Sequence, residues 1–165
     1  MVYSFLLDPL NRELLQSLQD VSLEKAGDGV NGESIGHYRE GNDEYIMKVK
    51  LVNGKKEGEA EVLKNGKPNI KMEYKNGSLD GKIEIVDEYG NAKVIGSVFD
   101  EDEDGLFKIY ENSVRVWVGY YEDGEAYSEL TECAFLKGYY MERRLGDDSI
   151  LSIAQYDDAL TGKNG

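Results

Sequence analysis

The order of apolar and polar residues first changes character near residue 27. Before that point, leucines recur at intervals of three or four residues and polar residues fill the other positions. This spacing places one apolar stripe along an α-helix. The stripe consists of Leu10, Leu14, Leu15, Leu18 and Val21. We expect a helix with Asp8 as its N-cap and Pro9 in its first turn, ending at Gly27.

Beyond residue 27 the chain alternates apolar and polar residues with a period of two. Such alternation predicts strands with one buried face. Asn-Gly pairs between the runs predict hairpins, because both residues of the tightest hairpin turns adopt positive φ. A long antiparallel meander should result. The expected strands are Tyr45–Val52, Glu59–Leu63, Asn69–Tyr74, Lys82–Val86, Ala92–Phe99, Leu106–Tyr110, Val114–Tyr121, Glu129–Phe135 and Tyr139–Arg144.

A turn motif, Asn-Gly-x-x-x-Gly, repeats in phase with the alternation. Its copies end at Gly36, Gly58, Gly81, Gly105 and Ser128, so the period is 22 to 24 residues. The fourth copy retains only its last glycine, and the fifth has serine in that place. A period of this length is typical of repeat arrays, in which each unit buries its apolar face against its neighbour.

Large apolar residues return at equivalent places in each repeat, and we expect each such column to lie on one buried face. The column after the motif is Tyr38, Ala60, Ile83, Phe107 and Leu130. The column of the return strands is Met47, Ile70, Ile95, Trp117 and Met141. The column before the turn is Leu51, Tyr74, Phe99 and Tyr121.

The pattern changes again after residue 145. Asp147 or Asp148 can cap a short C-terminal helix whose apolar residues are Ile150, Leu151, Ala154 and Leu160. A single twisted sheet leaves apolar faces uncovered, so we expect one or both terminal helices to pack on it.

One stretch resembles a known repeat family. Tyr74–Ile83 reads Tyr-Lys-Asn-Gly-Ser-Leu-Asp-Gly-Lys-Ile and resembles the Tyr-x-Asn-Gly-x-x-x-Gly core of MORN repeats. It is most similar to the variant type found in bacterial antitoxin-like proteins. Leu51–Ala60 resembles the same core with leucine in place of the tyrosine. The resemblance covers about residues 28–144 and is close only over 51–97.

The resemblance implies a sheet of stacked hairpins that serves as a scaffold or binding surface. MORN arrays occur in proteins with unrelated roles, so it implies no catalytic residue. The expected fold is mainly β: a single-layer antiparallel meander of MORN-like hairpins with a period of about 23 residues. The expected division is an N-terminal helix in 1–27, the sheet in 28–145, and the C-terminal helix and tail in 146–165.

The net charge of −14 narrows the classes of partner. Binding to nucleic acid or to an anionic membrane needs clustered Lys and Arg, which this chain lacks. A negative surface suits solubility or a basic protein partner. No apolar run reaches membrane-spanning length, and the first residues lack the basic region of a signal peptide. With Cys133 as the single cysteine, we expect a cytoplasmic protein that does not insert into a membrane.

An acidic segment has the spacing of a calcium loop. Asp100, Asp102 and Asp104, with Gly105 and Glu111, match the EF-hand pattern. The flanking segments read as strands rather than helices, however, and the glycine already belongs to the turn motif. We therefore interpret the segment as an acidic hairpin loop, with the three aspartates as the candidate Ca²⁺ ligands.

The chain offers little for catalysis. His37 is its single histidine, and no Cys and His set has the spacing of a zinc site. We expect a structural role for His37 and a core position for Cys133. No cofactor and no catalytic residue are predicted, so we expect a protein that is not an enzyme.

Aromatic residues are the candidates for protein binding, because Tyr and Trp dominate interface hot spots. Alternation places Trp117 and Tyr121 on one face of the sheet and Tyr120 on the other. The full set of candidates is Trp117, Tyr120, Tyr121, Tyr127 and Tyr139.

Two functions remain open from the residues alone. The first is a non-enzymatic interaction or scaffold module, a component of a larger complex. The alternative is an acidic immunity or antitoxin-type inhibitor that blocks a basic toxin or nuclease, for which the charge of −14 is suited.

Overall fold

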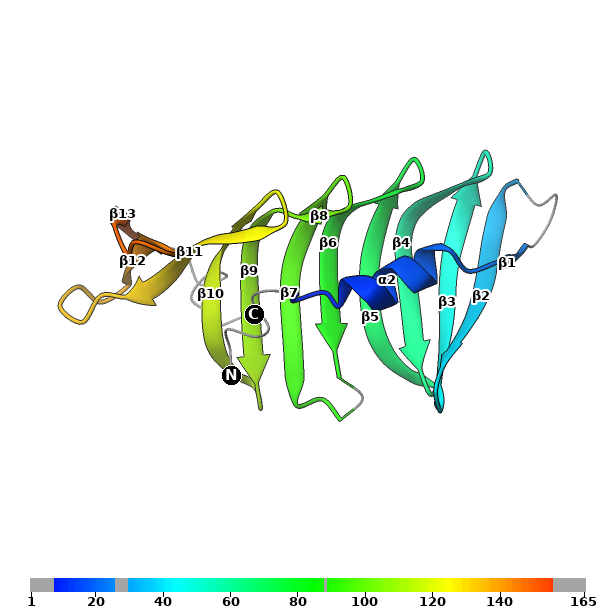
Figure 1. The fold of residues 1–165 in the computed structure, drawn as a ribbon, viewed down its shortest axis with the longest axis horizontal. Helices are drawn as coiled ribbons and strands as arrows, with labels where there is room; N and C mark the ends of the chain where they lie inside the picture. The colour runs from blue at the N-terminus through cyan, green and yellow to red at the C-terminus, as the bar shows by residue number, and fades with distance from the viewer. Residues whose placement is uncertain (1–7, 26–29, 88, 156–165) are drawn as a thin grey trace.

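The structure is a computed structural model that describes residues 8–25, 30–87 and 89–155. These residues form one open antiparallel sheet of 13 strands and a short helix near the N-terminus (Figure 1). The strand order follows the chain from β1 to β13, with β8 paired beside β7. The predicted β-meander is therefore confirmed. Its elements are α2 (Arg12–Gln19), β1 (Leu23–Lys25), β2 (Gly32–Glu40), β3 (Asp43–Val52), β4 (Lys55–Lys64), β5 (Lys67–Lys75), β6 (Ser78–Val86), β7 (Ala92–Phe99), β8 (Asp102–Glu103), β9 (Gly105–Glu111), β10 (Val114–Glu122), β11 (Glu125–Glu132), β12 (Tyr139–Arg144) and β13 (Ile150–Gln155).

The helix α2 is shorter than predicted. Its N-cap is Asn11, whose side chain accepts a hydrogen bond from the backbone N–H of Leu14 at 3.4 Å. Asp8 lies outside the helix and accepts the N–H of Arg12 at 2.9 Å, so the prediction of Asp8 as N-cap is wrong. The reason is that Asn11 adopts a left-handed backbone, with φ of 53°, which interrupts the helix before Arg12. The predicted continuation to Gly27 is also wrong, because the helix ends at Gln19 with Asp20 as its C-cap and Leu23–Lys25 forms the strand β1, paired with β2.

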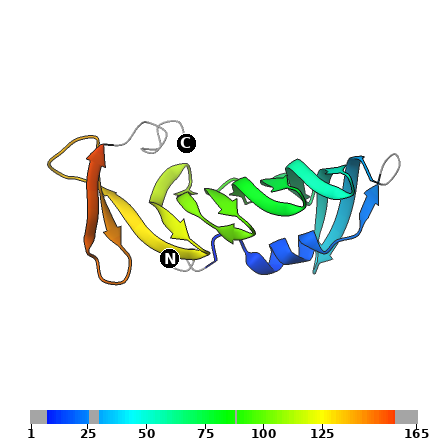
Figure 2. The same cartoon turned by 90° about the horizontal axis from the view of Figure 1, so that it is seen from above.

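The apolar stripe of α2 packs on one face of the sheet. Leu14, Leu15 and Leu18 are buried in the same cluster as the inward residues of β3 to β10, and Leu10 joins them from before the helix. Figure 2 shows α2 lying along this face, and no described helix lies on the opposite face. We call the buried cluster under α2 the helix-side core. Each of these leucines contributes about 1.5–3 kcal/mol by leaving water.

The predicted Asn-Gly turns form the hairpin ends. Asn53, Asn65 and Asn76 all have positive φ, between 50° and 52°. The turns are also joined from repeat to repeat. The backbone N–H of Gly77 donates to the carbonyl of Lys56 at 2.9 Å, and other turns repeat this bond. The equivalent donors are Gly54, to Val30, and Gly124, to Glu103.

The last glycine of the motif makes a bulge of two residues. Lys48 lies opposite Glu61 and Lys50 lies opposite Glu57, so β4 advances four residues while β3 advances two. The same count holds around Gly81, where Met72 and Tyr74 of β5 face Ile83 and Leu79 of β6. Gly81 has a φ of 123°, a conformation that a side chain would strain. Because two extra residues preserve the alternation, the apolar side chains return to the same face.

The fifth repeat has a bulge of only one residue. Tyr120 lies opposite Ser128 and Tyr121 lies opposite Ala126, so Tyr127 alone is extra. One extra residue reverses the alternation, and every later side chain of β11 changes face. Leu130 therefore does not join Phe107 in the helix-side core, as its column predicted. It packs on the opposite face.

The predicted column is also displaced in β7. The core positions of this strand are Val94, Gly96 and Val98, while Ile95 is half-buried and Phe99 is exposed. A Cβ on Gly96 would come within 2.2–2.5 Å of the ring of Phe107, so glycine is what admits this ring to the core. The predicted burial of Phe99 is wrong because the strand presents its neighbouring residues inward.

The C-terminal part corrects two further predictions. Residues 150–155 form the strand β13 rather than a helix, because they pair with β12 and Ile153 lies opposite Met141. Leu160, the last apolar residue of the predicted helix, lies outside the described residues. The predicted strand through Phe135 ends earlier, at Glu132. No helix in the described part of the chain combines the length and apolar character that a membrane crossing requires.

Candidate functional site

The change of face in β11 produces a second, smaller core. Val118, Leu130 and Tyr140 are buried together on the face away from α2, with Leu106 and Tyr120 half-buried against them. We call this group the far-side core. β12 and β13 turn out of the plane of the main sheet toward this face (Figure 2). The turn leaves a concave surface beside the far-side core.

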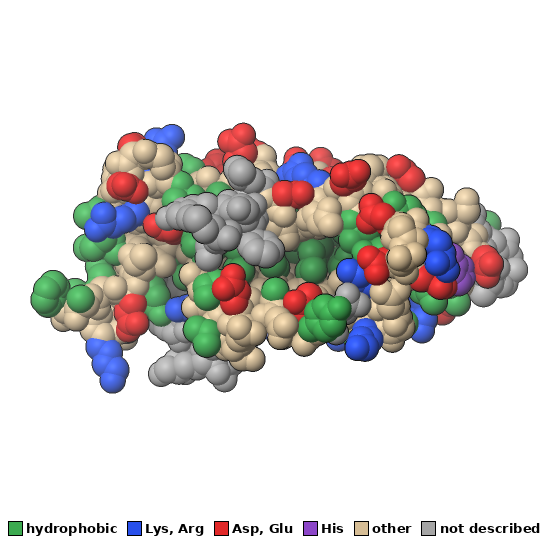
Figure 3. All heavy atoms as spheres, turned by 60° about the horizontal axis from the view of Figure 1, so that its bottom comes forward, with side chains coloured by type: hydrophobic (Ala, Val, Ile, Leu, Met, Phe, Trp, Pro, Cys, Tyr) green, Lys and Arg blue, Asp and Glu red, His purple; other side chains and the backbone are tan. Residues whose placement is uncertain are grey.

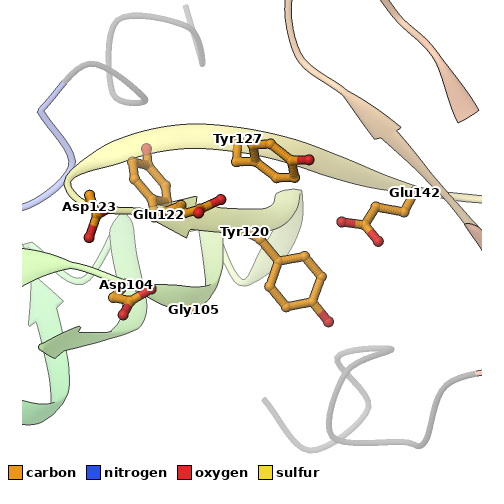
Figure 4. A pocket seen from close by; sticks show the side chains of 8 residues that line it. Asp104, Gly105, Tyr120, Glu122, Asp123, Tyr127 and Glu142 are labelled. Carbon is orange, nitrogen blue, oxygen red and sulfur yellow. The ribbon is translucent and has the colours of Figure 1, made fainter. Parts of the chain in front are cut away.

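A hollow of about 560 Å³ occupies this concave surface. Its lining comes from the loop before β9, from β10 and β11, and from β12. Figure 4 shows Glu142 projecting from β12 across the hollow from Tyr120 and Tyr127. The lining residues are Asp104, Gly105, Tyr120, Tyr121, Glu122, Asp123, Tyr127 and Glu142.

Glu142 is held in place by two hydroxyl groups. The Oγ of Ser128 donates to Glu142 Oε2 at 2.6 Å, and the Oγ of Ser152 donates to Glu142 Oε1 at 3.3 Å. Ser128 is fully buried and stands where the other repeats carry their last glycine. The serine that marks the degenerate fifth repeat thus orients an acidic side chain of the hollow.

The hollow combines negative charge with aromatic surface. Four carboxylates line it, and among the described residues no Lys or Arg does. The ring of Tyr127 already carries a cation on one side, since the guanidinium carbon of Arg144 lies 5.7 Å from its centroid. Burial, and after it the charges of Glu103 and Asp8, raise the pKa of Tyr121, so its phenol stays neutral. This surface suits a cationic ligand that also offers apolar stem atoms.

Of the predicted aromatic candidates, three meet at the hollow. Tyr120 and Tyr127 are half-buried and line it, and Tyr121 reaches it from the helix-side core. Trp117 is also on the helix side, where its Nε1 donates to Glu129 at 3.1 Å. Tyr139 is half-buried on β12 opposite Gln155 and takes no part in the lining. The predicted separation of Trp117 and Tyr121 from Tyr120 is confirmed by the two cores.

The three aspartates of the calcium-like segment go to different places. Asp104 lines the hollow, Asp100 occupies a turn with φ of 49°, and Asp102 pairs with Arg12 at 3.2 Å. The buried carboxylate of Glu103 also binds the Arg12 guanidinium. Burial acts to lower the pKa of Arg12, but the hydrogen bond and charge of Glu103, with those of Asp102, outweigh it and raise the pKa. The segment therefore anchors the start of α2.

The residues considered for catalysis do not converge. His37 is exposed on β2, and Cys133 is a half-buried free thiol in the loop after β11 rather than the core residue we expected. Among the described residues, no three His, Cys, Asp or Glu side chains are grouped so that they could hold a metal ion.

Sequence reasoning missed the acidic half of the hollow. The sequence pattern gives Glu122 and Asp123 no role in binding, and it places Glu142 only within the predicted strand Tyr139–Arg144. Alternation in Tyr139–Arg144 already places Glu142 on the same face as Tyr140. What the sequence did not reveal was the one-residue bulge that brings this face beside Tyr120.

Comparisons with known proteins give no family. No protein-family model matches the chain, and no curated protein matches it. The resemblance to MORN repeats stays a prediction that rests on the motif residues alone.

Proposed function

We propose that this protein is a non-enzymatic interaction module that binds a basic segment of a protein partner in the hollow between β10, β11 and β12. The observation that carries the proposal is the oriented carboxylate of Glu142 facing two tyrosines in a concave surface whose described lining holds four carboxylates and no Lys or Arg. Carboxylates with tyrosine rings suit lysine and arginine side chains, which offer a cation on an apolar stem. The net charge of −14 would speed encounter with such a partner.

A scaffold role in a larger complex is the form of this function that we favour. The sheet is long, and it separates the hollow from the far end at β1 and β2 (Figure 1). Such a shape leaves surface for a second partner. The MORN resemblance of residues 28–144 supports the same use.

The acidic hollow also supports the alternative function, inhibition of a basic toxin or nuclease. Pull-down at low and high salt separates the two, because exposed charge pairs are screened by salt. A large assembly that is retained at high salt would exclude the inhibitor. A small basic nuclease that is released at high salt would exclude the scaffold.

The hollow itself is tested with a synthetic probe, a decapeptide of alternating lysine and proline. Proline prevents this peptide from pairing as a β-strand, so it reports only the charged and aromatic surface. We expect the double variant Glu122→Gln/Glu142→Gln to bind it about tenfold more weakly than the wild type, measured by fluorescence anisotropy at low salt.

The matched control for this experiment is Glu33→Gln/Glu59→Gln, which removes the same charge from two exposed sites on β2 and β4. It should change the affinity less than twofold, an estimate for general electrostatic attraction of roughly this size. Equal losses in both double variants would mean that net charge alone attracts the peptide, and the hollow would not be the site. A glutamate–proline decapeptide should not bind.

A further inference from the structure

The last strand of the sheet has an open edge. β13 pairs with β12, and no other strand of the described residues pairs with it. Its six residues, Ile-Leu-Ser-Ile-Ala-Gln, contain no charge, in a chain whose net charge is −14. Ile150 and Ile153 are 55% and 52% exposed, and Leu151 is 41% exposed. An uncharged edge strand with exposed apolar residues is a ready template for another strand.

The edge strand at the other end of the sheet, β1, is short and charged. β1 has three residues, and two of them are Glu24 and Lys25. Short and charged edge strands resist pairing with other chains. The contrast shows that the open character of β13 is a local property and does not extend to both ends of the array.

Apolar surface gathers around the open edge. Ile153 lies opposite Met141 and Ile150 lies opposite Arg143, which places both isoleucines on one face of the sheet. The loop before β12 adds Phe135, which is 97% exposed, and Leu136. Figure 3 shows hydrophobic side chains at this end of the molecule, beside basic and acidic ones. A further strand with apolar residues at alternate positions would continue this face.

We propose that the edge of β13 binds an extended segment of a basic protein, which adds to the sheet as its next strand. Backbone hydrogen bonds would supply affinity, and the isoleucine face would select alternating apolar residues. Asp147 and Asp148 stand just before β13, whereas Arg143 lies opposite Ile150, so basic residues are favoured in the part of the added segment that lies beside the two aspartates. A second copy of this chain is disfavoured, because two chains of charge −14 repel each other at close range. The inference rests on the proposed function, since it takes the partner to be basic.

The test uses a decapeptide of alternating lysine and valine beside the lysine–proline decapeptide. Both carry the same charge, but only the first can form a strand. We expect the lysine–valine peptide to slow amide hydrogen exchange at residues 150–155, read by NMR, and the lysine–proline peptide to leave these amides unchanged. Ile153→Lys should weaken lysine–valine binding about tenfold, because one isoleucine is no longer covered and a like charge is added.

The matched control is Val114→Lys, which adds the same charge at a residue that is 63% exposed on β10 and away from the edge. It should leave lysine–valine binding within about twofold of the wild type. Unchanged exchange at the amides that pair β11 with β12 would show that this end of the sheet is folded in both variants.

Four outcomes would overturn the inference. The first is equal binding of both peptides without new protection in β13. The second is full protection of residues 150–155 in the free monomer. The third is protection that rises with protein concentration alone, which would assign the edge to a second copy. The fourth is binding that Glu122→Gln/Glu142→Gln weakens but Ile153→Lys does not, which would leave the proposed function standing. The reverse pattern would support the edge and overturn the hollow.

Discussion

The two ends of this sheet are built from the same repeat, but they bury opposite faces. From β3 to β6, the two-residue bulges at the motif glycines Gly58 and Gly81 return the apolar side chains to the side covered by α2. In β11 a one-residue bulge sends Leu130 to the other side, where only a small core covers it. The number of extra residues in a bulge thus determines which face of the sheet buries the apolar side chains that follow it, and hydrophobicity alone does not.

The comparison also explains where the candidate site lies. The regular part of the array directs its side chains into the helix-side core. The fifth repeat departs from the motif at Ser128 and exposes a concave surface that includes Glu142. The regular repeats form the stable core of the sheet, and the irregular fifth repeat forms the acidic and aromatic surface of the hollow.

The largest expected effect comes from a change in the bulge itself. One glycine inserted between Tyr127 and Ser128 would make the bulge two residues long, as in the earlier repeats. Leu130 would then turn toward the helix side and the far-side core would lose its centre. We expect amide protection to disappear from β11 to β13 and to persist in β3 to β6, measured by hydrogen exchange.

The control for this insertion is a glycine placed between Phe135 and Leu136, in the loop between β11 and β12. It lengthens an exposed loop without changing the register of either strand, so protection should stay as in the wild type. If β12 and β13 kept their protection in the bulge variant, the length of the bulge would not determine the face on which Leu130 is buried.

The second prediction compares the two cores directly. Phe107→Ala removes a fully buried ring from the helix-side core and should lower the free energy of unfolding by about 3–5 kcal/mol. Leu130→Ala removes a side chain from the small far-side core, where neighbours can relax, and should cost about 2 kcal/mol. Denaturant unfolding of both variants provides the measurement. A larger loss for Leu130→Ala would mean that the far-side core is the more stable of the two.

The smallest effect concerns the ion pair that anchors α2. Arg12→Met leaves the buried carboxylate of Glu103 without its cation and should cost about 2 kcal/mol. Fully buried pairs cost about 3–5 kcal/mol when broken, and the half-exposed guanidinium of Arg12 reduces the effect. Adding Glu103→Gln to this variant should recover part of the loss in thermal unfolding.

Arg39→Met is the control for the anchor, because Arg39 forms an exposed pair with Glu44 at 3.2 Å. Exposed pairs contribute about 0–1 kcal/mol, so the change should be small. Similar losses at Arg12 and Arg39 would show that burial of Glu103 adds nothing to the anchor.

Much of the fold could be predicted because local patterns determine hairpins. Asn-Gly pairs located the turns at Asn53, Asn65 and Asn76, and alternation located the strands between them. The apolar stripe identified α2, although Asn11 rather than Asp8 caps it. These features depend on neighbours in sequence, which is why the sequence alone contained them.

The parts that could not be predicted depend on pairing between strands. The sequence of one strand does not show whether a bulge holds one residue or two, so the column pattern predicts the wrong face for Leu130. The ring of Phe107 points inward because Gly96, on the neighbouring strand, has no side chain to block it. As a result Val94, Gly96 and Val98 of β7 face the core, and Ile95 and Phe99, which the column pattern predicts there, do not. Residues 150–155 could form a helix by spacing but pair with β12 instead. The acidic wall of the hollow was missed for the same reason.

The hydrogen bonds between successive turns have a consequence for how such a chain can change in length. A backbone N–H of one turn, from Gly54, Gly77, Glu101 or Gly124, donates to a carbonyl about one period earlier, so equivalent junctions present equivalent donors and acceptors. If its coding segment were duplicated, a whole added hairpin would pair the N–H and carbonyl groups of its turn with those of the neighbouring turns. A single added strand would leave these groups without partners. Neighbouring strands are about 4.8 Å apart, so each gain would move the ends of the array apart by about 10 Å. Evolution could therefore adjust the distance between two bound partners in steps of one hairpin, while the surface at either end stayed the same.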